Sequence, residues 1–185
     1  MVPVLSDLRV RKLKHLFNFV DTNNDGVLTV HDTELVADAI AALRGLKPGD
    51  DGYDNFRAGF MYYWADVREA SDLNKDGVVT IDEWVTYHNE MLADPERYDA
   101  TAQTSANLMF ALVDVDDDGV ITLDQYCGWL GAWGLTDPSA LAEVKRHLDP
   151  EGKGTLTLDE VLAYTREYFY SDDPGSPGNW SMGPL

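Results

Sequence analysis

The sequence predicts an all-α fold of four helix–loop–helix units, joined in two pairs to form one compact globule. Apolar residues recur close to every 3.6 positions in eight segments, which is the period of a helix with one buried face. Four acidic twelve-residue windows of one design lie between these segments. With 44% hydrophobic residues in a chain of 185, there is enough apolar surface for a core, which excludes a disordered protein.

The predicted helices flank the acidic windows in chain order. Leu13 and Phe17, for example, belong to the apolar stripe of the first helix. Linkers are expected at Gly45–Asp54, at Asp94–Pro95 and at Gly134–Pro138, because Gly and Pro interrupt regular structure. The eight predicted helices span residues 6–20, 30–44, 54–71, 81–92, 101–113, 123–133, 138–148 and 158–170.

Each acidic window begins with Asp and has Gly at position 6, an aliphatic residue at position 8 and Thr at position 9. This is the pattern of the EF-hand calcium loop. Ca²⁺ takes about six to eight oxygen ligands, so the chain must wrap around the ion. Side chains at positions 1, 3 and 5 point inward, position 7 offers its carbonyl, position 9 acts through a water and position 12 closes the shell. The windows, numbered as loops one to four, span residues 21–32, 72–83, 114–125 and 149–160.

The residue at position 8 is expected to form a short β contact with the neighbouring loop, so that the hands pair. These residues are Leu28, Val79, Ile121 and Leu156. Two pairs follow, and we expect an N-terminal pair over residues 1–93 and a C-terminal pair over residues 94–170. The apolar tail at 171–185 is expected to pack back on the core.

Loop two matches the pattern at every position. Its predicted ligands are the side chains of Asp72, Asn74 and Asp76, the carbonyl of Val78 and a bidentate Glu83. We therefore expect loop two to be the strongest Ca²⁺ site.

Loop one differs from the pattern at its last position. Its predicted ligands are Asp21, Asn23, Asp25, the carbonyl of Val27 and Asp32. Aspartate is one methylene shorter than glutamate and reaches the ion more easily with one oxygen than with two. Because fewer ligands favour the smaller, octahedral Mg²⁺, we expect Mg²⁺ to compete with Ca²⁺ at this site.

Loop three ends in a neutral amide. Its predicted ligands are Asp114, Asp116, Asp118, the carbonyl of Val120 and Gln125. Gln125 supplies one oxygen and no charge, which weakens the shell. Three carboxylates still converge there and would repel one another without a cation. We expect this loop to bind with reduced affinity.

Loop four carries a positive charge at a ligand position. Lys153 stands at position 5, Glu151 is long for position 3, and Pro150 stiffens the entry. An ammonium beside Asp149 and Glu160 can form an internal ion pair. We expect loop four not to bind Ca²⁺ and to act as the structural partner of loop three.

Charge and composition exclude several classes of function. The net charge of −19 would repel nucleic acid and anionic membranes, and it favours cations. The single cysteine, Cys127, rules out an intramolecular disulfide. No stretch reaches the ~20 apolar residues of a membrane helix, and the start Met1–Asp7 lacks the features of a secretory signal. No catalytic motif is present. We therefore expect a cytoplasmic, monomeric, non-enzymatic protein.

The whole chain resembles the invertebrate sarcoplasmic calcium-binding proteins, together with calexcitin and the bacterial calerythrin. The resemblance rests on the four loops, on Ser6–Leu13, on the long interval between Asp21 and Asp72 and on the tail Phe169–Leu185. It implies a compact fold that holds three ions with one degenerate hand and buffers cytosolic Ca²⁺ and Mg²⁺. Gln125 departs from the usual closing Glu.

A second resemblance is to the coelenterazine-binding photoproteins, whose first helix is similar to Lys14–Asp21. Photoproteins require a histidine in the last helix, and Val161–Tyr170 contains none. The chain ends in Leu185 instead of Pro, and the second hand, degenerate in photoproteins, is the best one here. The sequence therefore argues against luminescence.

A calcium sensor for a protein target is the main alternative to a buffer. Sensors open on binding Ca²⁺ and expose a Met-rich groove. The five methionines here are scattered, and Trp180, Met182 and Leu185 in the tail can cover such a groove. We expect a closed globule. The five tryptophans could line a ligand cavity, although packing between the lobes is the commoner role for such residues.

Overall fold

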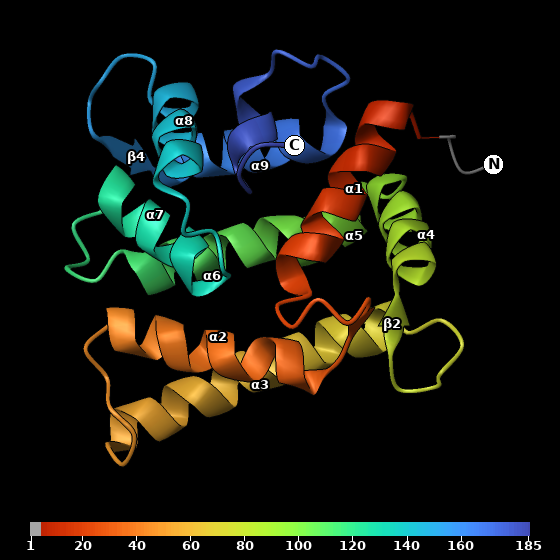
Figure 1. Ribbon diagram of the computed structural model, residues 1–185, viewed down its shortest axis with the longest axis horizontal. Helices are drawn as coiled ribbons and strands as arrows, with labels where there is room; N and C mark the ends of the chain where they lie inside the picture. Colours follow the sequence, from red (N-terminus) through yellow and green to blue (C-terminus); the bar gives the residue numbers. More distant parts are fainter. Residues whose placement is uncertain (1–4) are drawn as a thin grey trace.

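The computed structural model describes residues 5–185; Met1–Val4, which include most of the segment read for a secretory signal and the start of the expected N-terminal pair, lie outside the described residues. The all-α prediction is confirmed (Figure 1). The α-helices are α1 (Asp7–Val20), α2 (Val30–Leu43), α3 (Asp51–Ser71), α4 (Ile81–Leu92), α5 (Pro95–Tyr98), α6 (Thr104–Val113), α7 (Leu123–Ala132), α8 (Pro138–Leu148) and α9 (Leu158–Tyr170). A π-helical turn, η1, covers Asp99–Gln103, and a 3₁₀ turn, η2, covers Pro177–Trp180.

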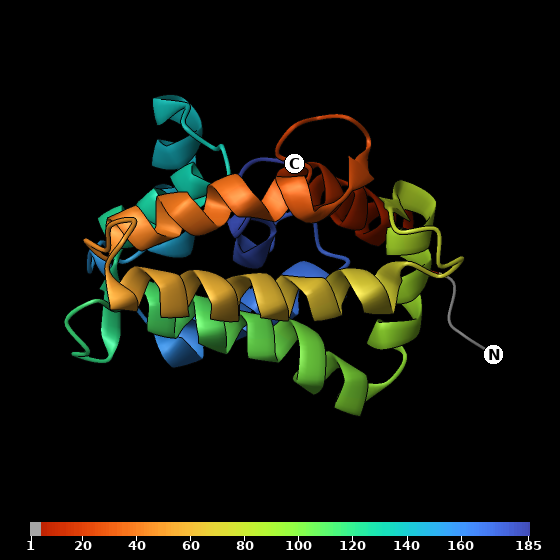
Figure 2. The ribbon, with the colours of Figure 1, turned by 90° about the horizontal axis from the view of Figure 1, so that it is seen from below.

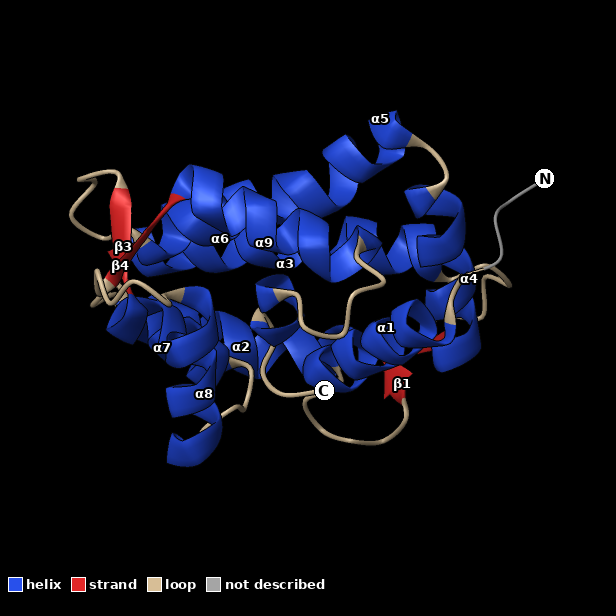
Figure 3. Cartoon of the chain, turned by 90° about the horizontal axis from the view of Figure 1, so that it is seen from above, coloured by secondary structure: helices blue, strands red, loops and turns tan. Residues whose placement is uncertain are grey.

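Two short antiparallel sheets join the loops in pairs, as the sequence predicts. In the first sheet β1 (Val27–Leu28) pairs with β2 (Val79–Thr80), and Leu28 lies opposite Val79. In the second, β3 (Val120–Thr122) pairs with β4 (Thr155–Thr157), and Ile121 lies opposite Leu156. All four position-8 side chains are buried. Figure 3 shows β3 and β4 side by side at one end of the molecule, with β1 at the other.

Helix α3 begins earlier than the sequence predicts, within the expected linker Gly45–Asp54. The reason is a tertiary contact: Tyr53 is buried against α2, and its hydroxyl donates a hydrogen bond to Asp38 Oδ1 at 2.5 Å. Asp51 also lies in the first turn, where a carboxylate is favoured by the helix dipole. Figures 1 and 2 show α2 and α3 running side by side.

The helix expected at 101–113 also begins earlier. Asp94 accepts hydrogen bonds from the backbone N–H groups of Glu96 and Arg97, and Pro95 occupies the first helical position. This is a favourable start for a helix, because proline has no N–H to leave unsatisfied there. From α5 the chain continues through η1 into α6 without a break. Asp94 and Pro95, which were expected to form a linker, therefore stand at the start of this helical segment.

One hydrophobic core runs through both halves of the chain. Its buried residues come from every pair of hands, including Phe17 of α1, Trp84 of α4, Phe110 of α6 and Phe169 of α9. Helix α1 packs against α4 and α9, and α2 packs against α3 and α7. Within residues 5–185, no helix combines the length and the apolar character needed to span a membrane.

The C-terminal segment lies against the core. Ser181 O accepts a hydrogen bond from the Tyr126 hydroxyl at 2.8 Å, and Met182 O lies 2.9 Å from His15 Nε2. The Trp180 ring stacks on His147 of α8 with ring centroids 4.0 Å apart. These contacts tie the tail to α1, α7 and α8.

Candidate metal centres

The first residue of each loop is organised by the backbone of the same loop. Asp21 accepts hydrogen bonds from the N–H groups of Asp25 and Gly26 at 3.2 and 2.9 Å. Asp72, Asp114 and Asp149 accept the two equivalent bonds in their own loops. These N–H groups hold each carboxylate at the centre of its turn, and the Asp side chains are buried or nearly so.

Left-handed backbone at two positions closes each turn. Position 6 is glycine in all four loops, with φ between 80° and 92°. Position 4 is also left-handed, with φ of 57° at Asn24, 63° at Lys75, 55° at Asp117 and 71° at Gly152. This second position is not part of the pattern from which the loops were predicted. Asn, Asp and Gly tolerate this conformation and supply a signal in three of the loops, but Lys75 supplies none.

The threonine at position 9 caps the following helix, a role the sequence analysis did not assign. In each loop the N–H of this threonine donates a hydrogen bond to the side chain of the residue at position 12. The acceptors in loops one to four are Asp32, Glu83, Gln125 and Glu160. The spacing is that of a capping box, with Thr followed three residues later by an acid or amide. A carboxylate at position 12 thus keeps one oxygen for the helix and has a second oxygen to offer, whereas Gln125 has no second oxygen.

In loop one that further atom is a buried oxygen. Asp32 is fully buried, its Oδ2 accepts from Thr29 N at 2.7 Å, and its Oδ1 has no hydrogen-bond partner among residues 5–185. Asn23 Oδ1 accepts from Asp25 N at 2.8 Å, and Asp25 Oδ1 accepts from Val27 N at 3.0 Å. A buried carboxylate oxygen without a donor is costly, and a bound cation would remove that cost. The donor set of loop one therefore fits a divalent cation.

In loop two the closing carboxylate spans the turn. Glu83 Oε2 accepts from Thr80 N at 2.9 Å, and Oε1 accepts from the N–H of Asn74 at 3.2 Å. The bonds from the Thr80 N–H and hydroxyl, with smaller contributions from the loop backbone, hold the pKa of Glu83 below its usual range. Asn74 accepts from Asp76 N at 2.8 Å, and Asp76 accepts from Val78 N at 3.1 Å. The side chains predicted to bind metal at positions 1, 3, 5 and 12 thus all accept hydrogen bonds from backbone N–H groups of the same loop.

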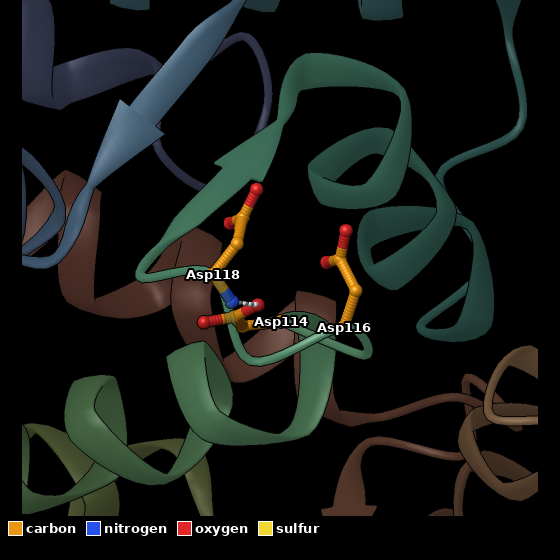
Figure 4. Close-up of side chains that lie close together, drawn as sticks. All are labelled: Asp114, Asp116 and Asp118. Carbon is orange, nitrogen blue, oxygen red and sulfur yellow. Dashed lines mark hydrogen bonds between the residues drawn. The ribbon is translucent and has the colours of Figure 1, made fainter.

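Loop three gathers three carboxylates. One oxygen from each of Asp114, Asp116 and Asp118 lies within 4.8 Å of the others (Figure 4). Across the described part of the chain, this is the one group of three acidic, histidine or cysteine ligands found so close together. Gln125 turns its Oε1 toward Thr122 N, at 2.6 Å. The acidic cluster suits a hard cation, whereas the closing residue is already engaged with the helix.

The position-7 residues are fixed through their N–H groups. Asp25, Asp76 and Asp118 accept from the N–H of Val27, Val78 and Val120 at 3.0, 3.1 and 3.0 Å. These bonds set the orientation of the preceding peptide. Ligation by the carbonyls of Val27, Val78 and Val120 stays a prediction.

Loop four contains the ion pair that the sequence predicts. The Lys153 ammonium donates to Glu160 Oε1, and the Lys153 N–H donates to Asp149 Oδ1 at 2.9 Å. The ammonium lowers the pKa of Glu160, and the carboxylate raises the pKa of Lys153. A positive charge thus already neutralises the position-12 carboxylate.

Known proteins resemble both the sequence and the fold. The family model described as "EF hand" matches residues 13–36 and 69–86, which cover hands one and two. Sarcoplasmic calcium-binding proteins II, V, VI and VII of Branchiostoma lanceolatum are 26% identical over 97% of this chain and 98% of their own length. Calerythrin of Saccharopolyspora erythraea is 24% identical over 86% of this chain and 90% of its own, and calexcitin-1 of Caenorhabditis elegans is 24% identical over 94% and 85%.

Solved structures confirm the fold. The amphioxus sarcoplasmic calcium-binding protein superposes with a TM-score of 0.72 at 24% identity, over 98% of this chain and 100% of its own. A coelenterazine-binding protein from Renilla muelleri gives 0.74 at 23% identity, with the same coverage. At this identity the second likeness concerns the fold alone. The relatives from Branchiostoma lanceolatum are named as calcium-binding proteins and not as enzymes, in agreement with the sequence prediction. With four EF-hand loops in register, paired through two short sheets, and about one quarter of its residues shared over nearly its whole length, the chain is similar in sequence and in fold to the sarcoplasmic calcium-binding proteins, and similar in sequence to calerythrin and calexcitin.

Proposed function

We propose that this protein binds Ca²⁺ through loops one, two and three and buffers the ion inside the cell. The observation that carries the proposal is the shared loop geometry, in which a position-1 carboxylate is held by two backbone N–H groups and faces further oxygen donors. Oxygen donors arranged around a tight turn are what Ca²⁺ requires. The names of the relatives, which are calcium-binding proteins, support the same proposal.

The three loops are proposed to differ in affinity and selectivity. Loop two supplies the full ligand set, with Glu83 closing the shell. Loop one, with the shorter Asp32, is proposed to accept Mg²⁺ in competition with Ca²⁺. Loop three is proposed to bind more weakly, because Gln125 is neutral. Loop four is proposed to stay without metal, because the Lys153 ammonium holds Glu160.

A buffer is favoured over a sensor by the way the tail lies on the core. Met182 lies against the aromatic interior, and the tail is hydrogen-bonded to α1 and α7 through His15 and Tyr126. Opening a groove for a target would break these contacts. We propose two coupled units, 1–93 and 94–170, closed by the tail 171–185, in a cytoplasmic monomer with no nucleic-acid or membrane partner.

Calorimetric titration of Ca²⁺ into the metal-free protein, with and without Mg²⁺, tests the binding proposal. We expect three Ca²⁺ ions per chain, and we expect Mg²⁺ to lower the apparent Ca²⁺ affinity mainly at one site. Four ions would contradict the role given to Lys153, and fewer than two would contradict the proposal as a whole. The fluorescence of the apolar dye ANS tests the buffer role separately, since a large increase on adding Ca²⁺ would indicate a sensor.

A further inference from the structure

The core contains an inner cavity, and an outer cavity adjoins it toward the surface; the metal loops explain neither. The inner cavity has a volume of about 110 Å³ and the outer one about 400 Å³. Helices α1, α3, α4, α6, α7 and α9 all contribute to the inner wall. The two cavities share six lining residues: Tyr63, Trp64, Ser105, Met109, Trp129 and Trp133. The two cavities therefore adjoin along this shared wall, and together they are far larger than the gaps of a close-packed interior.

The inner wall is uncharged. Its lining residues include no Asp, Glu, Lys or Arg. Its histidine, His88, is buried, and its Nδ1 lies 2.8 Å from Trp84 O. Burial lowers the pKa of His88 to about 4, so the ring is neutral at physiological pH. A charged ligand would lose its hydration in this cavity without gaining a counter-charge, and only an uncharged one suits it.

Two hydrogen-bond donors in this wall lack acceptors. The indole N–H groups of Trp84 and Trp133 are buried and have no hydrogen-bond partner among the described residues. An indole nitrogen can only donate, and a buried indole usually finds an acceptor. Both rings are fixed by aromatic neighbours: Trp133 lies 5.1 Å from Trp64 and 5.7 Å from Phe19, between ring centroids. Neither can turn out to solvent without breaking these contacts.

Water is a poor occupant for this space. A buried water needs about two to four polar partners, whereas the wall is mostly aromatic and aliphatic. The two polar side chains that pair across it, Tyr63 and Ser105, are already hydrogen-bonded to each other. An occupant that satisfies the indoles must therefore carry its own apolar surface as well as an acceptor.

We propose that this cavity is a binding site for an uncharged, planar aromatic molecule that has a carbonyl or ring-nitrogen acceptor. The acceptor receives a hydrogen bond from the N–H of Trp133 or, deeper in the core, from the N–H of Trp84. The aromatic wall stacks on the flat rings, and the acceptor fixes the orientation. The outer cavity supplies the entrance between α3 and α6, since its lining residues Asn55, Gly59 and Leu108 are exposed. This binding is separate from metal binding in the loops.

Two matched probes test the proposal on the intact, Ca²⁺-saturated protein. Acetylnaphthalene carries a carbonyl, and isopropenylnaphthalene has the same shape with CH₂ in place of the oxygen. We expect the ketone to bind roughly five- to tenfold more tightly, as one added hydrogen bond implies. In NMR spectra of the indole N–H groups, the ketone should shift Trp133 or Trp84, while Trp180, which lines neither cavity, serves as an internal reference.

Two kinds of variant separate the hydrogen bond from the space. Trp133→Phe and Trp84→Phe each keep an aromatic ring but remove the N–H, so in the variant of the indole that the ketone shifts, the affinity for the ketone should fall to about the affinity for the hydrocarbon. Ala106→Leu fills the inner cavity and should weaken both probes. If a variant does not fold, the indole shifts of the unaltered protein still decide. Equal affinity for the two probes with unmoved indole signals, or no binding of either, would overturn the proposal.

Discussion

Lys12, in α1, donates a hydrogen bond from its Nζ to Asn179 Oδ1 in the C-terminal segment, at 3.2 Å. The same ammonium donates to the carbonyl oxygens of Glu167 and Ser171 at 3.2 and 2.8 Å, at the end of α9. The Tyr168 hydroxyl in turn donates to Lys12 O at 2.7 Å. Lys12 is only 1% exposed, so these acceptors replace its water. One buried amine thus joins the first helix, the last helix and the tail.

Replacing Lys12 by Met should destabilise the protein and change its pH dependence. Three acceptors would lose a buried donor, which costs about 1–3 kcal/mol. Burial lowers the pKa of Lys12 from 10.5 to about 8, so the unfolded chain binds a proton that the folded protein lacks between these values. The free energy of unfolding contributed by Lys12 therefore rises with pH across this interval.

Urea denaturation of the original protein and of Lys12→Met at several pH values checks this. We expect the difference in free energy of unfolding between the two to widen from pH 8 to pH 10.5. A difference that stays constant or narrows would show that Lys12 is not the titrating group.

The contacts of Lys12 could not be predicted from the sequence, whereas other features of the fold could. The loops, their pairing and the Lys153–Glu160 ion pair follow from local spacing, because position in the twelve-residue pattern fixes what each residue meets. Lys12 meets residues more than 150 positions away, and nothing local distinguishes it from the surface lysines. The early start of α3 has the same origin, since it depends on Tyr53 meeting Asp38.

The candidate sites divide in the same way. Candidate ligand residues can be predicted from the sequence, and the spacing of Thr followed three residues later by an acid or amide also indicates the capping role of position 9. The unpartnered Oδ1 of Asp32 and the unpartnered indoles of Trp84 and Trp133 could not be predicted, because they depend on which side chains the whole fold brings near them.

Gly178→Ala should loosen the tail. A Cβ at Gly178 would lie 2.5 Å from both Tyr164 O and Glu167 Cβ, and backbone cannot give way as a flexible side chain can. We expect a loss of about 1–3 kcal/mol, typical of overpacking. Thermal unfolding of the Ca²⁺-saturated protein measures it.

Gly175→Ala is the matched control for Gly178→Ala. Gly175 lies in the same segment, and its Cβ would meet only Asp173 Oδ1, at 3.3 Å. Its effect should be within a few tenths of a kcal/mol. Equal effects of the two substitutions would mean that the tail does not dock at Gly178 as described.

Lys153→Asp should create a fourth metal site. The change removes the ammonium that pairs with Glu160 and adds a carboxylate at position 5. Calorimetric titration should then find one more Ca²⁺ per chain than in the original protein. Lys153→Met, which removes the charge without adding a ligand, is the control and should add no site of comparable affinity. An unchanged count in Lys153→Asp would place the defect of loop four at Pro150 or Glu151.

Asp32→Glu should shift the selectivity of loop one toward Ca²⁺. The longer side chain can bring both of its oxygens to the ion, whereas Asp32 is expected to reach it with one, so the number of ligands rises to a value that Ca²⁺ but not Mg²⁺ accepts. Competition titrations with both ions measure the ratio of affinities. Asp32→Asn keeps the length of the side chain and the helix cap but removes the charge, so it should lower the affinity of loop one for both ions. The same ratio of Ca²⁺ to Mg²⁺ affinity in Asp32→Glu as in the original protein would rule out Asp32 as the determinant of selectivity.

Gln125→Glu should strengthen loop three. Asp114, Asp116 and Asp118 already lie together, and a carboxylate at position 125 adds a charge and a second oxygen while its other oxygen still caps Thr122. We expect the Ca²⁺ affinity of this site to rise by about tenfold or more, because charge and ligand number set affinity in these loops. Calorimetry on Gln125→Glu and on Gln125→Met, which lacks the oxygen, measures both directions. If Gln125→Met binds as tightly as the original protein, the shell of loop three closes without position 12.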